Sequence, residues 1–387
     1  MTHHSPTLRR RRFQQLLAGA AAGWLGAAAG EAPAPSLDSL ARARGLRFGS
    51  ALGVLPSGAR RVSRFHDLPY RELVGRECSV LVAENETKWP QLRPDPAKPY
   101  AFGPADEMFA WAKARGMALR GHTLVWVEPK WLPPWLAEMD FGARPAAAME
   151  RLLAEHVAAV CGHFGRDVES WDVVNEAVDP ATGSLHENAF TRAMGALPHL
   201  ARMFELAREH APHAELVYND YMGWGADGAK HRAGVLRLLA DLKARGAPVQ
   251  ALGVQAHIGV WSLPATTSAA TVAEWRRFLD EVAGLGLKLL VTEFDVNDQA
   301  LPGAVAERDA GVAALARDWL DVTLAQPRLN RLLCWGLADH HSWLQDFAPR
   351  ADGLPKRVLP YEESLRPKPL REAIAAALRA MPARPAA

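Results

Sequence analysis

The chain contains 387 residues, of which 49% are hydrophobic and 23% charged, and its formal net charge is +2. If the four arginines at positions 9–12 are set aside, 41 basic residues remain against 43 acidic ones, a net charge of −2. This balance argues against the strongly basic surface of proteins that bind nucleic acid or anionic membranes. The length exceeds one average domain, but it also suits a single α/β barrel of about 250 residues or more.

The first 30 residues differ in composition from the rest of the chain. Four arginines precede an apolar, alanine-rich stretch, and no acidic residue occurs before Glu31. Such a segment is typical of an export signal, and Arg-Arg-x-Phe within positions 10–13 resembles the twin-arginine motif. The alternative is a basic amphipathic helix that stays attached. We expect residues 1–30 to direct a bacterial protein to the periplasm or the medium, with cleavage near 27–29 or 32–34 and a short Pro/Ala linker at 31–36.

From residue 46 onward, short β-like runs alternate with longer helical patterns. The expected strands cover residues 46–53, 79–86, 118–126, 168–177, 215–221, 251–258, 287–296 and 332–339. Apolar residues recur at helical spacing between them, for example over 104–116, 145–165, 229–246 and 272–286, and several of these segments end in glycine. Eight apolar strands without strict alternation predict a parallel sheet that closes into a (β/α)8 TIM barrel. We predict one such barrel over residues 37–382.

Polar residues gather at the end of each expected strand, after its apolar part. They are Glu84, Asn85, Glu86, His122, Trp126, Asn175, Glu176, Asn219, Asp220, Gln255, His257, Glu293, Asp295, Trp335 and Asp339. The carboxyl ends of parallel barrel strands meet at one rim, where barrel enzymes carry their active sites. The fourth expected strand, residues 168–177, has an apolar body and then reaches Asn175 and Glu176. A site at this rim explains why a buried strand ends on a carboxylate.

Two of these carboxylates, Glu176 after the fourth strand and Glu293 after the seventh, are expected to face each other across the barrel mouth. A carboxylate pair is the minimum requirement for glycoside hydrolysis, with a separation of about 5 to 5.5 Å in retaining and about 6.5 to 9.5 Å in inverting enzymes. The charge of Glu293 would help to keep Glu176 protonated. The structural alternative is a pair of buried glutamates in ion pairs with Lys288 or arginines.

Tryptophan is abundant, with 13 residues in the chain. Four of them lie near the ends of expected strands, where an indole is suited to cover the apolar face of a sugar: Trp89, Trp126, Trp335 and Trp343. Three others lie in helical patterns, and we expect them in the core: Trp111, Trp275 and Trp319.

Several short motifs occur together in one order. WDVVNEA, GVQAHI, VTEFDV and WGLADHHSWL are preceded by AENETKW and GHTLVW and followed by RPKP. In this respect the chain resembles glycoside hydrolase family 10, the endo-β-1,4-xylanases, over essentially all residues after the export segment. The resemblance implies a retaining endo-β-1,4-xylanase that acts by double displacement on xylan and xylo-oligosaccharides.

The resemblance also implies residue roles. Glu176 matches the general acid/base and Glu293 the nucleophile, Asn175 would bind the 2-hydroxyl of the sugar, and His257 would orient Glu293 with Asp295 behind it. The residues that match the subsites on the non-reducing side are Glu84, Asn85, Lys88, His122, Trp126, Gln255, Trp335 and Trp343. The departures are Thr87 in place of the usual Met, Pro90 in place of an acidic residue, and the pair His340-His341; they bear on fine specificity.

Three alternatives differ in class or substrate. A related barrel glycosidase would act on β-1,4-glucan or mannan. An inactive carbohydrate-binding barrel would bind xylo-oligosaccharides without cleavage. A metal-dependent barrel hydrolase would use rim residues such as His122, His257, His340, His341, Asp220 and Asp339, although the spacings HxH and HExxH are absent.

The remaining expectations are mostly absences. The three cysteines, Cys78, Cys161 and Cys334, are too few and too scattered for a disulfide framework and are expected to be small buried hydrophobes, although one disulfide is compatible with export. We expect no cofactor, no metal, no nucleic acid, no membrane attachment of the mature protein, and a monomer.

Overall fold

The structure is a computed structural model that describes residues 34–56, 62–260 and 267–384. The predicted export signal and the start of the linker therefore lie outside the described residues. The first described helix begins at Leu37 and the last ends at Ala380. No described helix is both long enough and apolar enough to span a bilayer. Cys78, Cys161 and Cys334 are all buried and unpaired, as expected of small hydrophobic residues.

The strands form a closed parallel barrel. They are β1 Arg47–Leu52, β2 Val80–Ala83, β3 Ala118–Trp126, β4 Val168–Asn175, β5 Glu215–Asp220, β6 Ala251–Val254, β7 His257–Ile258, β8 Lys288–Val296 and β9 Leu329–Cys334. Their order is β6-β5-β4-β3-β2-β1-β9-β8-β7, and a further pairing of β6 with β8 closes the ring. The short β7 pairs only with β8 among the described strands, so eight strands make the barrel. The predicted (β/α)8 fold is confirmed.

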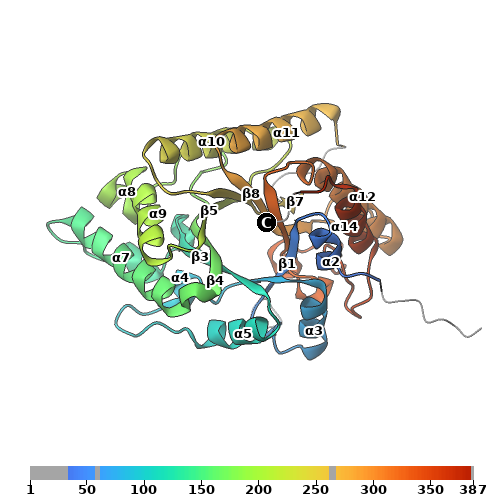
Figure 1. The fold of residues 1–387 in the computed structure, drawn as a ribbon, viewed down its shortest axis with the longest axis horizontal. Coiled ribbons are helices and arrows are strands. Elements are labelled where there is room, and N and C mark those ends of the chain that lie inside the picture. The colour runs from blue at the N-terminus through green and yellow to red at the C-terminus, as the bar shows by residue number, and fades with distance from the viewer. Residues whose placement is uncertain (1–33, 57–61, 261–266, 385–387) are drawn as a thin grey trace, which may run out of the picture. The chain divides into compact units, whose positions relative to one another are not determined.

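Helices surround the barrel. They are α2 Leu37–Arg42, α3 Leu68–Glu77, α4 Trp89–Leu92, α5 Gly103–Ala114, α6 Pro134–Glu138, α7 Pro145–Phe164, α8 Ala189–Met194, α9 Pro198–His210, α10 Ala229–Ala244, α11 Ala269–Gly284, α12 Val305–Thr323, α13 Leu344–Phe347 and α14 Pro369–Ala380. Figure 1 shows α7 to α9 beside β4 and β5, α10 and α11 along a second side, and α2, α12 and α14 together on a third. The predicted glycine ends are also present, since Gly165 after α7 and Gly246 after α10 both have positive φ.

Two of the expected strands differ from the observed ones in ways that bear on the site. The sixth, expected over 251–258, breaks into β6 and β7 because Ala256 takes a left-handed conformation with φ 64°. The eighth, expected over 332–339, begins at Leu329 and ends at Cys334, and Gly336 beyond it has φ 98°. Despite both shifts, Gln255 and Trp335 directly follow the carboxyl ends of β6 and β9, and His257 begins the short β7 beyond β6.

Tight packing beneath the barrel mouth fixes the backbone that carries His122. Trp171 on β4 is fully buried, and its ring lies where a side chain at Gly121 on β3 would be, because an added Cβ would come within 2.0 Å of the indole. Only glycine allows the strands to approach this closely around the ring. The next residue, His122, is thereby held at the floor of the barrel mouth.

Candidate active site

A groove of about 550 Å³ opens at the carboxyl ends of the strands. Its lining includes both predicted catalytic carboxylates, Glu176 and Glu293, together with His257. It also includes every residue matched to the subsites on the non-reducing side, namely Glu84, Asn85, Lys88, His122, Trp126, Gln255, Trp335 and Trp343. The structure thus brings side chains from six separate strand ends into one cavity.

Glu176 lies just past the end of β4 and is 6% exposed. Its φ of 54° places it in the left-handed region, which is unusual for a residue with a side chain and often marks a functional site. Its carboxylate accepts hydrogen bonds from Gln255 Nε2 at 2.7 Å, Trp126 Nε1 at 2.8 Å and Asn175 Nδ2 at 3.1 Å. Burial raises the pKa of Glu176 to about 8, because the two opposing hydrogen bonds from Gln255 and Trp126 compensate only in part.

The charge of Asp220 contributes to the raised pKa of Glu176 ahead of the charge of Glu293. The predicted effect of Glu293 on its partner is therefore present, but it is secondary to burial. Glu176 is consequently a carboxylic acid that keeps its proton at neutral pH.

Glu293 lies on β8 and is surrounded by donors. Asn219 Nδ2 donates to its Oε1 at 2.8 Å, and His257 Nε2 lies 3.3 Å from its Oε2. Burial alone would raise the pKa of Glu293, but His122, His257 and Asn219 together lower it to about 2. Two carboxyl groups of one groove are therefore held in opposite protonation states, which is the arrangement of an acid paired with a nucleophile.

A layer of amides connects the two carboxyl groups. Asn219 Nδ2 donates to Asn175 Oδ1 at 2.9 Å and also to Glu293, while Asn175 Nδ2 donates to Glu176. Asn175 is fully buried and is absent from the described groove lining, so its predicted contact with a sugar hydroxyl remains a prediction. In this structure Asn175 positions Glu176.

Two imidazoles stand beside Glu293, and each is backed by an aspartate. His122 Nδ1 lies 2.9 Å from Asp172 Oδ2, and Asp172 in turn pairs with the buried Arg120. His257 Nδ1 lies 3.0 Å from Asp295 Oδ1, as the predicted order Glu293, His257, Asp295 requires. Burial alone would lower the pKa of His257, but Asp295 and Glu293 raise it to about 10.

The wall on the predicted non-reducing side combines a cation with flat rings. Lys88 Nζ donates to Asn85 Oδ1 at 3.0 Å and lies 4.8 Å from the centre of the Trp126 ring and 5.9 Å from that of Trp335. Glu84 pairs with Arg64 at 2.6 Å. Such a surface offers hydrogen bonds for hydroxyl groups and apolar faces for sugar rings.

Trp89, one of the tryptophans expected at the rim, does not line the groove. Trp89 begins α4, is 2% exposed and stacks on His156 with ring centres 3.8 Å apart, so the expectation that it contacts a sugar is wrong. The helix starts at this residue and directs the indole into the core. Trp275 and Trp319 are buried as expected, and Trp111 is half-buried against the core.

Most of the residues considered for a metal-dependent hydrolase are dispersed, although His340 and His341 are neighbours. Asp220 lies 3.1 Å from His231, and Asp339 lies 2.8 Å from Lys368 Nζ, while His122 and His257 serve Glu293 as described. The described residues therefore do not assemble these groups around one catalytic ion.

Some groove residues were not predicted from the sequence. They are Arg64, Gln91, Glu128, Lys130, Trp131, Tyr221, Asp346 and Phe347. Pro90, which also lines the groove, is one of the departures named from the sequence, and Asn219 beneath the groove is one of the expected rim residues. Trp131 stacks on Trp126 at 4.6 Å, and its position soon after the third strand was a usable signal. Tyr221 directly follows Asn219 and Asp220 at the end of β5. Arg64 comes from a loop far from its partner Glu84, and no local pattern indicates it.

Comparison with known proteins extends this description. Residues 36–377 match Glycosyl hydrolase family 10. The chain is 30% identical to Endo-1,4-beta-xylanase B of Thermotoga neapolitana over 316 residues, which cover 81% of this chain and 85% of that protein. It is 29% identical to Exoglucanase XynX of Acetivibrio thermocellus over 83% of this chain and 28% of that protein. The structure of xylanase 10B from Thermotoga petrophila RKU-1 in complex with xylobiose is similar with a TM-score of 0.77 at 28% identity, covering 90% of this chain and 98% of that one.

Proposed function

Since the chain belongs to glycosyl hydrolase family 10, a family of glycoside hydrolases, we propose that it is a retaining endo-β-1,4-xylanase. The observation that carries this proposal is the placement of Glu176 and Glu293 in one groove with different surroundings. Burial raises the pKa of Glu176 and favours its protonated form, whereas His257 and Asn219 beside Glu293 favour its ionised form. The names of the relatives and the xylobiose in a similar structure support xylan as the substrate.

In the first step, Glu176 donates its proton to the glycosidic oxygen while a carboxylate oxygen of Glu293 attacks the anomeric carbon. The bond from that carbon to the leaving oxygen breaks, the shortened chain leaves as an alcohol, and the sugar is held as an ester of Glu293. Burial keeps the proton on Glu176, and His257 and Asn219 keep Glu293 ionised, so both groups begin in the required state.

In the second step, ionised Glu176 takes a proton from water, and the water oxygen attacks the anomeric carbon. The ester bond breaks, Glu293 is released as a carboxylate, and Glu176 is again protonated. Two displacements at one carbon retain its configuration. The loss of the Glu293 charge on forming the ester removes one of the contributions that raise the pKa of Glu176, which favours its change from acid to base.

Product analysis on xylan, cellulose and mannan side by side tests the substrate. We expect xylo-oligosaccharides of several lengths from xylan and little release from the other two polysaccharides. Proton NMR of the first products tests the mechanism, since the β-anomer must appear before mutarotation. A higher rate on cellulose would favour the glucan alternative, which the likeness to an exoglucanase keeps open, and an initial α-anomer would refute double displacement.

We also propose that residues 1–30 direct export through the twin-arginine route, on the basis of the arginines and the apolar stretch that follows them. Replacing Arg10 and Arg11 with lysine should leave full-length precursor in the cytoplasm. Export that continues unchanged in this double variant would leave a general secretory signal as the explanation.

A further inference from the structure

A second cavity of about 430 Å³ has acidic, basic and imidazole groups in its wall. Asp67, His340 and His341 line it, and none of the three has a role in the proposed reaction. His340 and His341 belong to the 3-10 helix η4, Asp339–His341, and Asp67 lies directly before α3.

The ligand atoms of these three residues converge. His341 Nε2 lies 2.8 Å from Asp67 Oδ2, and His340 Nε2 lies 3.6 Å from the same oxygen. Each of the three residues offers one ligand atom that lies within 4.8 Å of those of the other two. In a tetrahedral zinc site with bonds of about 2.0 to 2.1 Å, neighbouring ligand atoms are about 3.3 Å apart. The observed separations bracket this value, so shifts on the order of 1 Å or less would enclose an ion.

A helix cap and the ring of Tyr70 hold the three side chains in place before any ion arrives. Asp67 caps α3 by accepting from Tyr70 N through Oδ1, which leaves Oδ2 for the histidines. Tyr70 itself packs against the rings of both His340 and His341. A site of this kind pays little conformational entropy on binding.

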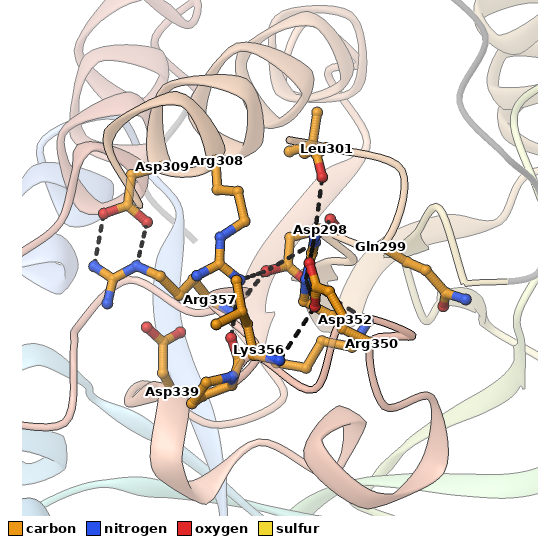
Figure 2. Close-up of polar contacts among 12 residues, drawn as sticks. Asp298, Gln299, Leu301, Arg308, Asp309, Asp339, Arg350, Asp352, Lys356 and Arg357 are labelled. Atoms are coloured by element: carbon orange, nitrogen blue, oxygen red, sulfur yellow. Dashed lines mark hydrogen bonds and ion pairs between the residues drawn. The ribbon is translucent and has the colours of Figure 1, made fainter. Parts of the chain in front are cut away.

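The cations that line the same cavity are engaged with other carboxylates. Figure 2 shows Arg357 against Asp309, and Arg308 and Lys356 around Asp298. These carboxylates compensate the positive charge of the three cations. Among the described residues, the basic side chains in contact with Asp67 are the two histidines.

We propose that Asp67, His340 and His341 bind a borderline divalent cation, with zinc the best match to two imidazoles and one carboxylate. Water from the cavity completes the coordination. Among the described residues, this is the group of His, Cys, Asp and Glu that has ligand geometry, and it departs from the expectation of no metal.

The ion would link two segments that support the substrate groove, the residue before α3 and the 3-10 helix η4. His341 is followed by Ser342 and by Trp343, which lines the groove. Arg64 donates to the carbonyl oxygen of His341 at 2.7 Å and pairs with Glu84, another groove residue. The role of the ion is therefore to stabilise this wall, and the chemistry stays with the carboxylate pair.

Zinc titration of the purified, chelator-treated chain by calorimetry tests the proposal, with thermal unfolding as a second readout. We expect zinc binding that depends on these three residues, with a higher melting temperature that a chelator reverses. Asp67→Asn keeps an acceptor for the helix cap, and His340→Gln changes a partly exposed ring, so both should fold and bind zinc on the order of 100-fold more weakly.

His66→Gln is the matched control. His66 precedes Asp67 and contacts Glu107 at 2.9 Å, so its loss should leave the zinc affinity unchanged. X-ray absorption of the wild-type zinc complex gives a test that needs no variant, with two imidazoles expected among the ligands. Equal affinity in Asp67→Asn, His340→Gln and the wild type would refute the site, as would a zinc complex without two imidazole ligands or the absence of binding at 100 μM zinc.

Discussion

The strand β8 delivers two buried carboxylates to very different surroundings. Glu293 lies within the strand and accepts from an amide and an imidazole, whereas Asp298, two residues past its end, is enclosed by cations (Figure 2). Arg308, Lys356 and Arg350 lie 3.1, 3.5 and 3.8 Å from the Asp298 carboxylate. Glu293 and Asp298 are similarly buried, so the residues around each carboxylate decide whether it takes part in catalysis or in ion pairs.

The difference between the two sites shows which surroundings leave a buried carboxylate available to react with a substrate. Three fixed cations compensate the charge of Asp298, and such a group is held in place by its ion pairs. Glu293 instead contacts the neutral amide of Asn219 and a histidine, His257, whose pKa is raised to about 10, and its carboxylate lines an open groove. Glu176 has amide and indole donors, and for this reason burial dominates its pKa.

The largest expected effect concerns the roles of Glu176 and Glu293. Glu176→Ala should lower xylan cleavage by about 10³-fold or more, because a sugar leaving group needs a proton, but spare the first step on an aryl glycoside with a good leaving group. Added azide should restore turnover and give a β-glycosyl azide. Glu293→Ala should lose activity on both substrates. Steady-state rates with and without azide measure this, and identical behaviour of the two variants on every substrate would refute the assignment.

Asp298→Ala should instead act on stability. It leaves Arg308, Lys356 and Arg350 without their shared carboxylate, and uncompensated buried charge of this kind costs about 3 to 5 kcal/mol. Urea unfolding monitored by fluorescence gives the change in the free energy of unfolding. The matched control is Asp167→Ala, which breaks an exposed pair with Lys113 and should cost about 1 kcal/mol or less. Equal losses in the two variants would contradict the proposed importance of the enclosed cluster.

The sequence predicted the active-site carboxylates better than the cluster around Asp298. Glu176 and Glu293 end or follow apolar runs, which is a local signal that the closure of a parallel barrel converts into proximity. The partners of Asp298 come from α12 and from the chain beyond α13, so only the folded structure brings them together. The prediction that Trp89 contacts a sugar is wrong for a related reason, because the direction of its side chain depends on where α4 begins. Arg64 was not predicted because it reaches Glu84 from a loop.

Glu176→Gln should stabilise the protein in a way that depends on pH. The pKa of Glu176 is raised from 4.5 to about 8 in the folded state, so the folded chain holds a proton that the unfolded chain has lost between these values. Wild-type stability therefore falls as pH rises from 4.5 to 8, and glutamine removes this loss. We expect a gain of about 3 kcal/mol at pH 7 and almost none at pH 4, measured by urea unfolding. A gain that is the same at both pH values would show that the pKa of Glu176 is not raised.

The smallest expected effect concerns Trp343. Its Nε1 donates at 2.8 Å to Asp295, the carboxylate that lies between Glu293 and Asp298 in the sequence. This bond fixes the Trp343 indole at the wall of the groove, against His257 and Phe347. A glucosyl unit differs from a xylosyl unit by one hydroxymethyl group, and we expect Trp343 to crowd that position. Trp343→Ala should lower kcat/KM on aryl xylobioside and raise relative activity on aryl cellobioside, a change in preference of about 1 to 3 kcal/mol.

Lys88→Ala is the matched comparison for Trp343→Ala, because both side chains line the same groove. Lys88, whose ammonium lies next to Asn85, is placed to bind hydroxyl groups that both sugars share. It does not crowd the hydroxymethyl group by which a glucosyl unit differs from a xylosyl unit. Its loss should therefore depress both substrates in similar proportion, while only the loss of the indole changes their ratio. Measuring the two aryl glycosides on both variants separates these effects. If the ratio stays constant in Trp343→Ala, the wall that distinguishes xylose from glucose is formed by other residues of the groove.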